Sequence, residues 1–294
     1  PWSPERDWKM LKSANSILMA FLERPDNILS TIPFIVLKAE WGRSSATVPY
    51  NWRLMRQQFE ADGETGNAWT YTELVKFYEL WSDVNGTRVD SWADDQDILV
   101  DAYVDGADLY VIVNNLEFDD TTFDLDVAGI GNVLSVDIKH LRADSGVPVL
   151  ETETLSALPD SMTLGGEATM ILRFELDAVV TIDETSDESK HYAATMLQAI
   201  AASTTLSFDV DGLAPVAYGD GILSLGVGRA HGLSLTPDVT VYGTTVYVPT
   251  DYLGYEQFHN VKGREYFFGV LDITVPWTSI EADNQVDITF PDDG

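Results

Sequence analysis

The sequence predicts a mixed fold, in which a short helix-and-strand segment (residues 1–90) precedes two antiparallel β-sandwich domains (91–180 and 181–294). Two observations predict this division. Residues 1–90 contain 10 Lys+Arg and 12 Asp+Glu, and the rest of the chain contains 7 and 36, so the net charge changes from −2 to −29. Seven of the eight tryptophans also lie in the first 92 residues. Such different compositions indicate two kinds of structure.

The first segment is predicted to contain two helices. Ser3-Pro4-Glu5 is typical of a helix start, because Ser caps the first turn, Pro fits within it and the acid lies near the positive end of the dipole. Apolar residues at three- and four-residue steps then predict one buried face of a helix over 3–24: Trp8, Leu11, Ala14, Ile17, Leu18, Phe21 and Leu22. A second helix is predicted over 72–83, with four residues on its inner side: Leu74, Phe77, Tyr78 and Trp81.

Between these helices, Pro33–Leu37 is an apolar run without alternation, which predicts a parallel strand buried on both faces. The strand is expected to end at Lys38–Gly42. A long loop that contains Tyr50, Trp52, Arg53 and Trp69 is expected to follow it.

Residues 91–294 are predicted to form β structure throughout. Ile98–Tyr103 and Leu109–Val113 flank Asp105-Gly106, a strong hairpin signal. Further strands are predicted between turns rich in Gly, Asp and Pro: Phe123–Val127, Val133–Leu141, Val147–Thr154, Ala168–Leu176, Thr205–Val210, Ile222–Val227, Val239–Val248, Arg264–Val275 and Val286–Phe290. This spacing is typical of antiparallel sandwiches. The polar stretch Asp183–Lys190 is the expected boundary between the two.

Charge and composition disfavour several classes of function. A net charge of −31 would repel nucleic acid and anionic membranes, so neither is an expected partner. No stretch approaches the ~20 apolar residues of a membrane helix. Cysteine is absent, which excludes disulfides, thiolate metal sites and cysteine nucleophiles. The four histidines have no zinc-binding spacing, and no nucleophile elbow or phosphate-binding glycine loop occurs.

Several phrases carry a family resemblance. They are Pro1–Trp8 (PWSPERDW), Ile32–Gly42 (IPFIVLKAEWG), Leu74–Trp81 (LVKFYELW), Gly86–Asp90 (GTRVD) and Val100–Gly106 (VDAYVDG). With them, the chain resembles the β-agarase and β-porphyranase family of glycoside hydrolases, family 86. The resemblance extends over the whole chain and is specific in the first 115 residues.

Members of that family have a (β/α)8 barrel followed by two β-sandwiches, and they cut β-1,4 linkages of red-algal galactans with retention of configuration. The resemblance implies that residues 1–90 are the C-terminal end of the barrel, with Phe34–Leu37 as its eighth strand. It also implies a secreted or cell-surface enzyme that requires no cofactor. The implied partner is an algal galactan, either agarose or porphyran.

The same resemblance places the catalytic residues outside the chain. Retaining enzymes use two carboxylates about 5–5.5 Å apart. In barrels of this class they lie at the ends of strands four and seven, which here are upstream of Pro1. We therefore expect a part of a longer protein that lacks the catalytic pair, needs the missing N-terminal barrel portion and is inactive alone.

Candidate substrate-binding residues follow from the resemblance, because ligands of such barrels collect at the carboxyl ends of the strands. Trp41 is expected to stack on a galactose unit or to fill the barrel mouth. Glu40 is expected to bind a sugar hydroxyl or to pair with Lys38 or Arg43. Trp52 and Arg53 in the next loop, and Trp2, are further candidates for the cleft wall. For Trp52 and Arg53, packing under the neighbouring loop is the alternative, and Arg53 could also balance a neighbouring acid.

Two interpretations of the second segment stay open. Acidic pairs suit a structural Ca²⁺, although none has the spacing of a calcium loop, and a solvated surface is the default: Asp94-Asp95, Asp119-Asp120 and Asp209-Val210-Asp211. The sandwiches alternatively form a non-catalytic carbohydrate-binding or structural module. A sugar platform there would depend mainly on tyrosines, since Trp277 is the sole tryptophan after Trp92: Tyr242, Tyr247, Tyr252 and Tyr255.

Overall fold

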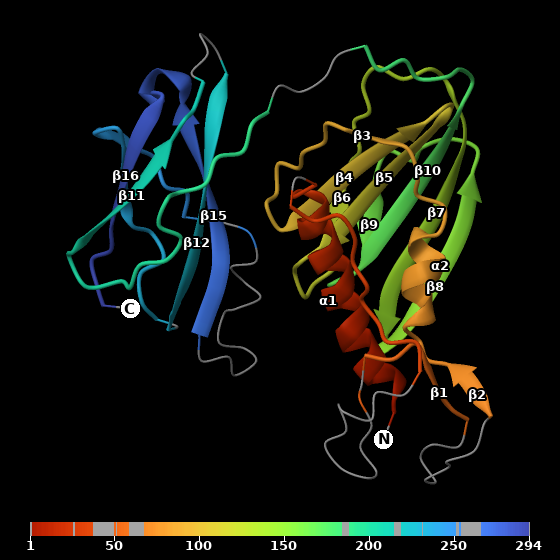
Figure 1. The fold of residues 1–294 in the computed structure, drawn as a ribbon. Coiled ribbons are helices and arrows are strands. Elements are labelled where there is room, and N and C mark those ends of the chain that lie inside the picture. The colour runs from red at the N-terminus through yellow and green to blue at the C-terminus, as the bar shows by residue number, and fades with distance from the viewer. Residues whose placement is uncertain are drawn as a thin grey trace. The chain divides into compact units, whose positions relative to one another are not determined.

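The computed structural model describes residues 2–25, 27–37, 50, 52–58, 68–183, 188–214, 219–230, 232–250, 253 and 266–293. The chain divides into two compact units, unit 1 (Pro1–Ile182) and unit 2 (Asp183–Gly294). Each unit has its own sheets, so each is described by itself (Figure 1). In the described part of the chain, no helix has the length and apolar character needed to cross a membrane.

Unit 1 is built around a six-stranded antiparallel sheet in the order β3-β4-β5-β10-β7-β8. Two short antiparallel pairs, β1-β2 and β6-β9, lie outside this sheet. The elements in chain order are α1 (Pro4–Leu22), β1 (Met55–Gln57), β2 (Trp69–Tyr71), α2 (Val75–Trp81), β3 (Thr87–Val89), β4 (Ile98–Asp105), β5 (Asp108–Asn115), β6 (Thr121–Phe123), β7 (Val133–Asp144), β8 (Val147–Leu155), β9 (Met162–Leu164) and β10 (Thr169–Leu176).

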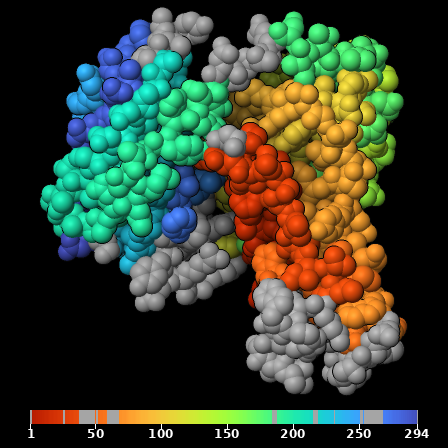
Figure 2. Space-filling model, viewed as in Figure 1, coloured from red at the N-terminus to blue at the C-terminus, as the bar shows by residue number. Residues whose placement is uncertain are grey.

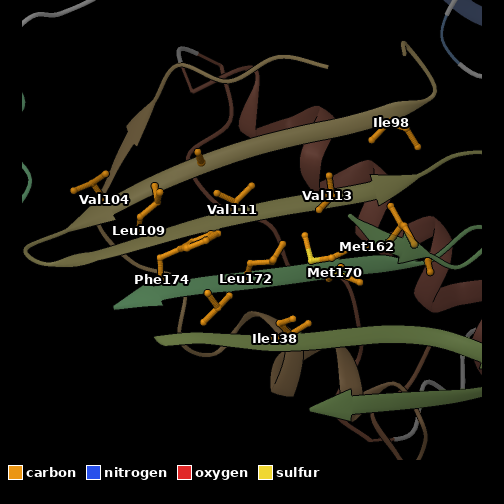
Figure 3. Packing of buried hydrophobic residues seen from close by; sticks show 14 of the residues in the cluster. Ile98, Val104, Leu109, Val111, Val113, Ile138, Met162, Met170, Leu172 and Phe174 are labelled. Atoms are coloured by element: carbon orange, nitrogen blue, oxygen red, sulfur yellow. The ribbon is translucent and has the colours of Figure 1, made fainter. Parts of the chain in front are cut away.

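The central strands of the large sheet, β5 and β10, are buried on both faces. Figure 1 shows α1 and α2 on one face, where Leu11 and Phe77 belong to the same core as Ile112 of β5. On the other face, residues of β6 and β9 pack with Val111 and Phe174, and Figure 3 shows this second core from close by. Successive residues of β5 therefore point into different cores, and every residue of β5 after the first is buried.

Both predicted helices are present. The Ser3 side chain caps α1 by accepting a hydrogen bond from the backbone N–H of Arg6, as the Ser-Pro-Glu start predicts. The second helix is shorter than predicted and runs from Val75 to Trp81. Its predicted inner face is correct for Phe77 but wrong for Tyr78, which is 41% exposed.

The buried face of α1 is rotated from the predicted one. Ile17 and Phe21 were expected inside and are 46% and 37% exposed, whereas Asp7 and Asn15 are buried. Burial of Asn15 is compensated, because its side-chain oxygen accepts a hydrogen bond from Nε1 of Trp81 at 2.8 Å. Apolar spacing alone does not identify the inner face when polar side chains find buried partners.

Within this chain, Pro33–Leu37 is buried only in part. Phe34 is buried, but Val36 and Leu37 are 60% and 42% exposed. In the parts of the chain that the structure describes, this segment forms one isolated parallel bridge, between Ile35 and Arg53. The side chains of Val36 and Leu37 are thus left without full cover by the residues that the structure describes. Its assignment to a barrel stays a prediction.

Unit 2 contains a four-stranded antiparallel sheet in the order β11-β16-β13-β14 and a two-stranded pair, β12-β15. Its apolar core includes residues from both, among them Val239, Leu271 and Ile288. The elements are β11 (Thr205–Asp211), β12 (Asp220–Ala230), β13 (Asp238–Val241), β14 (Thr244–Val246), β15 (Tyr266–Pro276), the short 3₁₀ helix η3 (Trp277–Ser279) and β16 (Asp283–Thr289).

Two connections differ from the prediction. The expected loop before α2 contains the antiparallel pair β1-β2. The expected strand Val239–Val248 is the hairpin β13-β14, which turns at Tyr242 and Gly243 with φ of 47° and 75°. Turns with two positive φ angles favour Asn-Gly or Asp-Gly, so a Tyr at the first position conceals the turn.

Ile112 provides a test of the two-sided burial. Its side chain is fully buried, so Ile112→Ala is expected to lower the free energy of unfolding by about 2–5 kcal/mol. Ile32→Ala, at a side chain that is 88% exposed, is expected to change it by less than about 0.5 kcal/mol. Urea denaturation followed by circular dichroism measures both changes. Equal effects would contradict the burial of Ile112.

Arg229 holds the C-terminal end of the described chain within unit 2. Its fully buried guanidinium donates hydrogen bonds to the carbonyl oxygens of Ser234, Asp292 and Asp293, the last two at 3.1 and 2.7 Å. It also lies over the ring of Phe290, 4.6 Å from the centroid. The planar fork of an arginine presents its donors in a fixed arrangement, which the single ammonium of a lysine does not reproduce.

Arg229→Lys is therefore expected to lower the free energy of unfolding by about 3 kcal/mol or more. Arg142→Lys is the matched control, because Arg142 forms a surface ion pair with Glu151 and should cost less than about 1 kcal/mol. Thermal unfolding of the two variants beside the wild type gives the comparison. A loss at position 229 no larger than that at position 142 would show that the buried contacts contribute little.

Candidate functional site

Three of the six residues predicted to bind substrate lie in the described structure. Lys38, Glu40 and Trp41 lie outside the described residues. The other three lie around β1 in unit 1, near the start of α1 and the turn before α2. We define the β1 cluster as these three residues with two that the sequence did not single out: Trp2, Asp7, Trp52, Arg53 and Arg56.

Trp52 is part of an aromatic group that includes two residues of α2. Its ring stacks on Phe34 with centroids 6.1 Å apart and an interplanar angle of 28°. Phe34 in turn meets Phe77 and Tyr78 edge to face at 5.5 and 6.1 Å. Trp52 therefore packs within the protein, as the alternative reading expected. The side chain is half-buried, so part of it stays exposed. A role in sugar binding stays a prediction.

Arg53 is buried, with 3% of its surface exposed. Its backbone is held on two sides, because Ile35 forms the parallel bridge with it and the hydroxyl of Thr72 donates to its carbonyl oxygen at 2.9 Å. Burial of this degree is typical of a structural arginine. The predicted contact of Arg53 with a galactan would need its guanidinium to become accessible, and it stays a prediction.

Trp2 is held by contacts to two other elements. Its indole Nε1 donates a hydrogen bond of 2.7 Å to Oδ2 of Asp7 in the first turns of α1. The guanidinium of Arg56, on β1, lies 3.9 Å from the centroid of the Trp2 ring. This is within the range of a cation–π contact. The indole plane is thus fixed relative to α1 and β1.

Asp7 is the titratable group at the centre of the β1 cluster. Only 2% of it is exposed, and Oδ2 also accepts a hydrogen bond from the backbone N–H of Glu73 at 2.8 Å. Burial raises the pKa of Asp7 to about 6, against the lowering effect of these hydrogen bonds. The Glu73 carboxylate raises this pKa further, and Arg6 lowers it.

No sequence pattern points to Asp7 or Arg56 as members of a site. In the sequence, Asp7 reads as an acid in the first turn of a helix. The helix dipole is enough to explain an acid there, so the position does not indicate a site. The partners of Asp7 are distant in the chain or bind it through their backbone. Neither kind of contact produces a recognisable pattern of residue types in the sequence. Among the described residues, no group of three or more His, Asp or Glu side chains could hold a metal ion. Calcium binding therefore stays a prediction.

The acidic pairs singled out in the sequence have local roles where the structure describes them. Asp95 accepts a hydrogen bond from the N–H of Asp97, and Asp120 accepts one from the N–H of Gly166. Asp209 and Asp211 line an open hollow of about 480 Å³ on unit 2, beside Tyr242. The hydrogen bonds accepted by Asp95 and Asp120 stabilise local backbone conformation.

Asp7→Asn tests the buried charge. The pKa of Asp7 is higher in the folded than in the unfolded chain, so its stabilising contribution is complete below pH 4 and is lost as the pH rises through about 6. Asn keeps an acceptor without the charge. The free energy of unfolding of the variant, minus that of the wild type, should therefore increase from pH 4 to 7 by on the order of 2–3 kcal/mol.

Glu5→Gln is the matched control, because Glu5 is a fully exposed carboxylate on the same turn whose pKa is lowered by hydrogen bonds to its own backbone and to Ser3. It should not show this increase. Urea titrations at several pH values give the differences. A difference for Asp7→Asn that does not vary with pH would mean that Asp7 is not a desolvated carboxylate.

Comparison with known proteins agrees with this fold and with the resemblance. A family model described as porphyranase β-sandwich domain 1 matches residues 97–198, and one described as β-porphyranase A C-terminal matches residues 207–294. A funoran endo-β-hydrolase from Wenyingzhuangia aestuarii is 45% identical over 298 residues, which cover 99% of this chain and 40% of the relative. The chain thus contains sandwich domains of the porphyranase type.

Two solved structures match the whole chain. BuGH86wt in complex with neoagarooctaose is 40% identical with a TM-score of 0.86, over 100% of this chain and 47% of that one. A β-porphyranase of glycoside hydrolase family 86 from the human gut bacterium Bacteroides plebeius is 27% identical with a TM-score of 0.79, over 100% and 51%. The chain belongs to the β-agarase and β-porphyranase family, glycoside hydrolase family 86. It spans about half or less of the length of these relatives.

Proposed function

We propose that this chain is the C-terminal part of a retaining endo-glycoside hydrolase that cuts β-1,4 linkages in red-algal galactans. It supplies one wall of the substrate cleft and two accessory sandwiches. The observation that carries this proposal is a match over the whole chain to relatives of which the chain spans 40% to 51%. A galactan polymer is too large to enter a cell intact, so the enzyme is expected to be secreted or attached to the cell surface.

Exposed apolar residues in unit 1 support a missing barrel portion as the partner. Monomeric soluble proteins seldom expose many large apolar side chains close together in the chain, because their burial is favourable. Figure 2 shows α1 at the surface of unit 1. Six such residues lie on α1 and in the segment after it: Ile17, Phe21, Leu29, Ile32, Val36 and Leu37, with exposures from 37% to 97%.

The β1 cluster supports a cleft wall without the catalytic pair. Asp7 and Glu73 are two carboxylates near Trp2, but Asp7 is buried against two N–H donors and the Glu73 carboxylate is paired with Lys76. Neither is free to attack a sugar carbon or to protonate a leaving group. The two carboxylates that retention requires are therefore expected in the preceding portion of the enzyme.

The proposal is tested by joining this chain to the N-terminal portion of the Wenyingzhuangia aestuarii relative. Reducing-sugar release from agarose, porphyran and funoran is expected from the fusion and not from the 294-residue chain alone. Turnover by the chain alone at a rate similar to that of the fusion would contradict the proposal. Folding of the chain is verified by circular dichroism, so that inactivity is not confused with misfolding.

Ile32→Asp in the fusion tests the apolar contact. The side chain is 88% exposed, so the change is not expected to unfold unit 1. If the barrel covers Ile32, the change should reduce activity of the fusion at least about tenfold, since burying an isoleucine contributes about 2 kcal/mol. Lys9→Asp, at an exposed polar position of α1, is the control and should have a smaller effect.

A further inference from the structure

Asp7 joins parts of unit 1 that are far apart in the sequence. One carboxylate oxygen, Oδ2, accepts hydrogen bonds from the indole of Trp2 at 2.7 Å and from the backbone N–H of Glu73 at 2.8 Å. Glu73 lies in the turn before α2, so Asp7 connects the residue before α1 with the start of α2. The carboxylate is closed off from solvent on the inner side of α1.

This burial is unfavourable for a charged group. Desolvation raises the pKa of Asp7 to about 6, so at neutral pH the folded protein holds a charge that the unfolded chain would solvate better. A neutral acceptor would satisfy the same two donors at a lower desolvation cost. The negative charge of Asp7 strengthens the two hydrogen bonds that it accepts, because hydrogen bonds to an ionised acceptor are roughly twice as strong as neutral ones.

The side chain whose orientation these hydrogen bonds hold is that of Trp2. Its nitrogen is fixed by Asp7, and its ring lies against the guanidinium of Arg56. Together these contacts define the plane of the indole, while the side chain stays partly exposed. An aromatic ring held in one plane, with part of its surface open, is suited to stacking on the apolar face of a sugar ring.

We propose that Asp7 is a positioning residue, whose negative charge holds the Trp2 indole in the orientation that stacks on a neutral galactan unit. The proposal rests on the proposed function, because it assigns Trp2 to the cleft wall. Asp7 itself does not touch the sugar. Its protonation weakens the acceptor for the Trp2 indole, so stacking by Trp2 is lost as the pH falls through the pKa of Asp7.

The charged groups around Asp7 are consistent with this dependence on pH. Arg6 on α1 favours the charged form, and the Glu73 carboxylate before α2 opposes it. Glu73 is paired with Lys76 of α2, and Arg56 of β1 faces the Trp2 ring. The Glu73 carboxylate is therefore the group that a control variant must remove.

The first measurement follows the indole N–H signals of the whole chain by ¹H–¹⁵N NMR, with Trp2 assigned by its absence from a Trp2→Phe variant. The Trp2 signal is expected to shift between pH 8 and 5 with a midpoint near 6, and not to titrate in Asp7→Asn. Glu73→Gln is the matched control, because it removes the neighbouring carboxylate and keeps the backbone donor. Its Trp2 signal should still titrate. A Trp2 signal that does not titrate in the wild type would overturn the proposal.

The second measurement adds neoagarooctaose at pH 8 and follows the same signals. The Trp2 signal is expected to shift, with affinity about tenfold weaker in Asp7→Asn and unchanged in Glu73→Gln. If other indole signals respond but Trp2 does not, or if Asp7→Asn binds as well as the wild type, the role of Asp7 is wrong and the proposed function stands. If no indole signal responds at any sugar concentration, the assignment of this chain to a cleft wall is wrong as well.

Discussion

The double burial of the central sheet of unit 1 is the constraint on which the rest of that unit depends. A sheet in a sandwich usually has one face in the core and one in water, and its strands then alternate between apolar and polar residues. Here β5 does not alternate, because α1 and α2 cover the face that would otherwise be wet. Ile112 and Ile171 belong to the core with the helices, and Val111 and Leu172 belong to the core with β6 and β9. The helices and the strands therefore stabilise one another.

Ion pairs determine how α1 is positioned along the sheet. Lys12 of α1 pairs with Glu167 in the turn before β10, and Arg88 of β3 connects Glu23, just after α1, with the buried Asp101 of β4. Apolar packing between a helix and a sheet tolerates sliding, whereas ion pairs at the middle and at the C-terminal end of α1 define one register. The position of Trp2, one residue before the cap of α1, follows from that register.

Local signals in the sequence predicted local structure well. The capping serine of α1 and the Asp105-Gly106 turn act through contacts within a few residues, and both are present. The extent of burial of the apolar run Pro33–Leu37 could not be predicted from the run itself, because it depends on neighbours that the run does not encode. The β13-β14 turn was missed because Tyr242 adopts a positive φ that is rare for its type. In the β1 cluster, Trp2, Trp52 and Arg53 were singled out as candidates by the resemblance. Asp7 and Arg56 were not, because their partners are set by the tertiary fold.

The packing of α1 and α2 against the sheet limits where this protein can be cut to exchange domains with other enzymes. The change in charge near residue 90 suggests a natural point for exchanging sandwiches between enzymes. A piece that began there would carry a sheet whose residues Tyr110, Ile112, Leu141 and Ile171 had lost their cover. Such a piece would be prone to aggregate, and an engineered chimera would need to take both helices along with the strands. Unit 1 is therefore exchanged intact with least loss of buried contacts, and unit 2, which has a core of its own, can be exchanged separately.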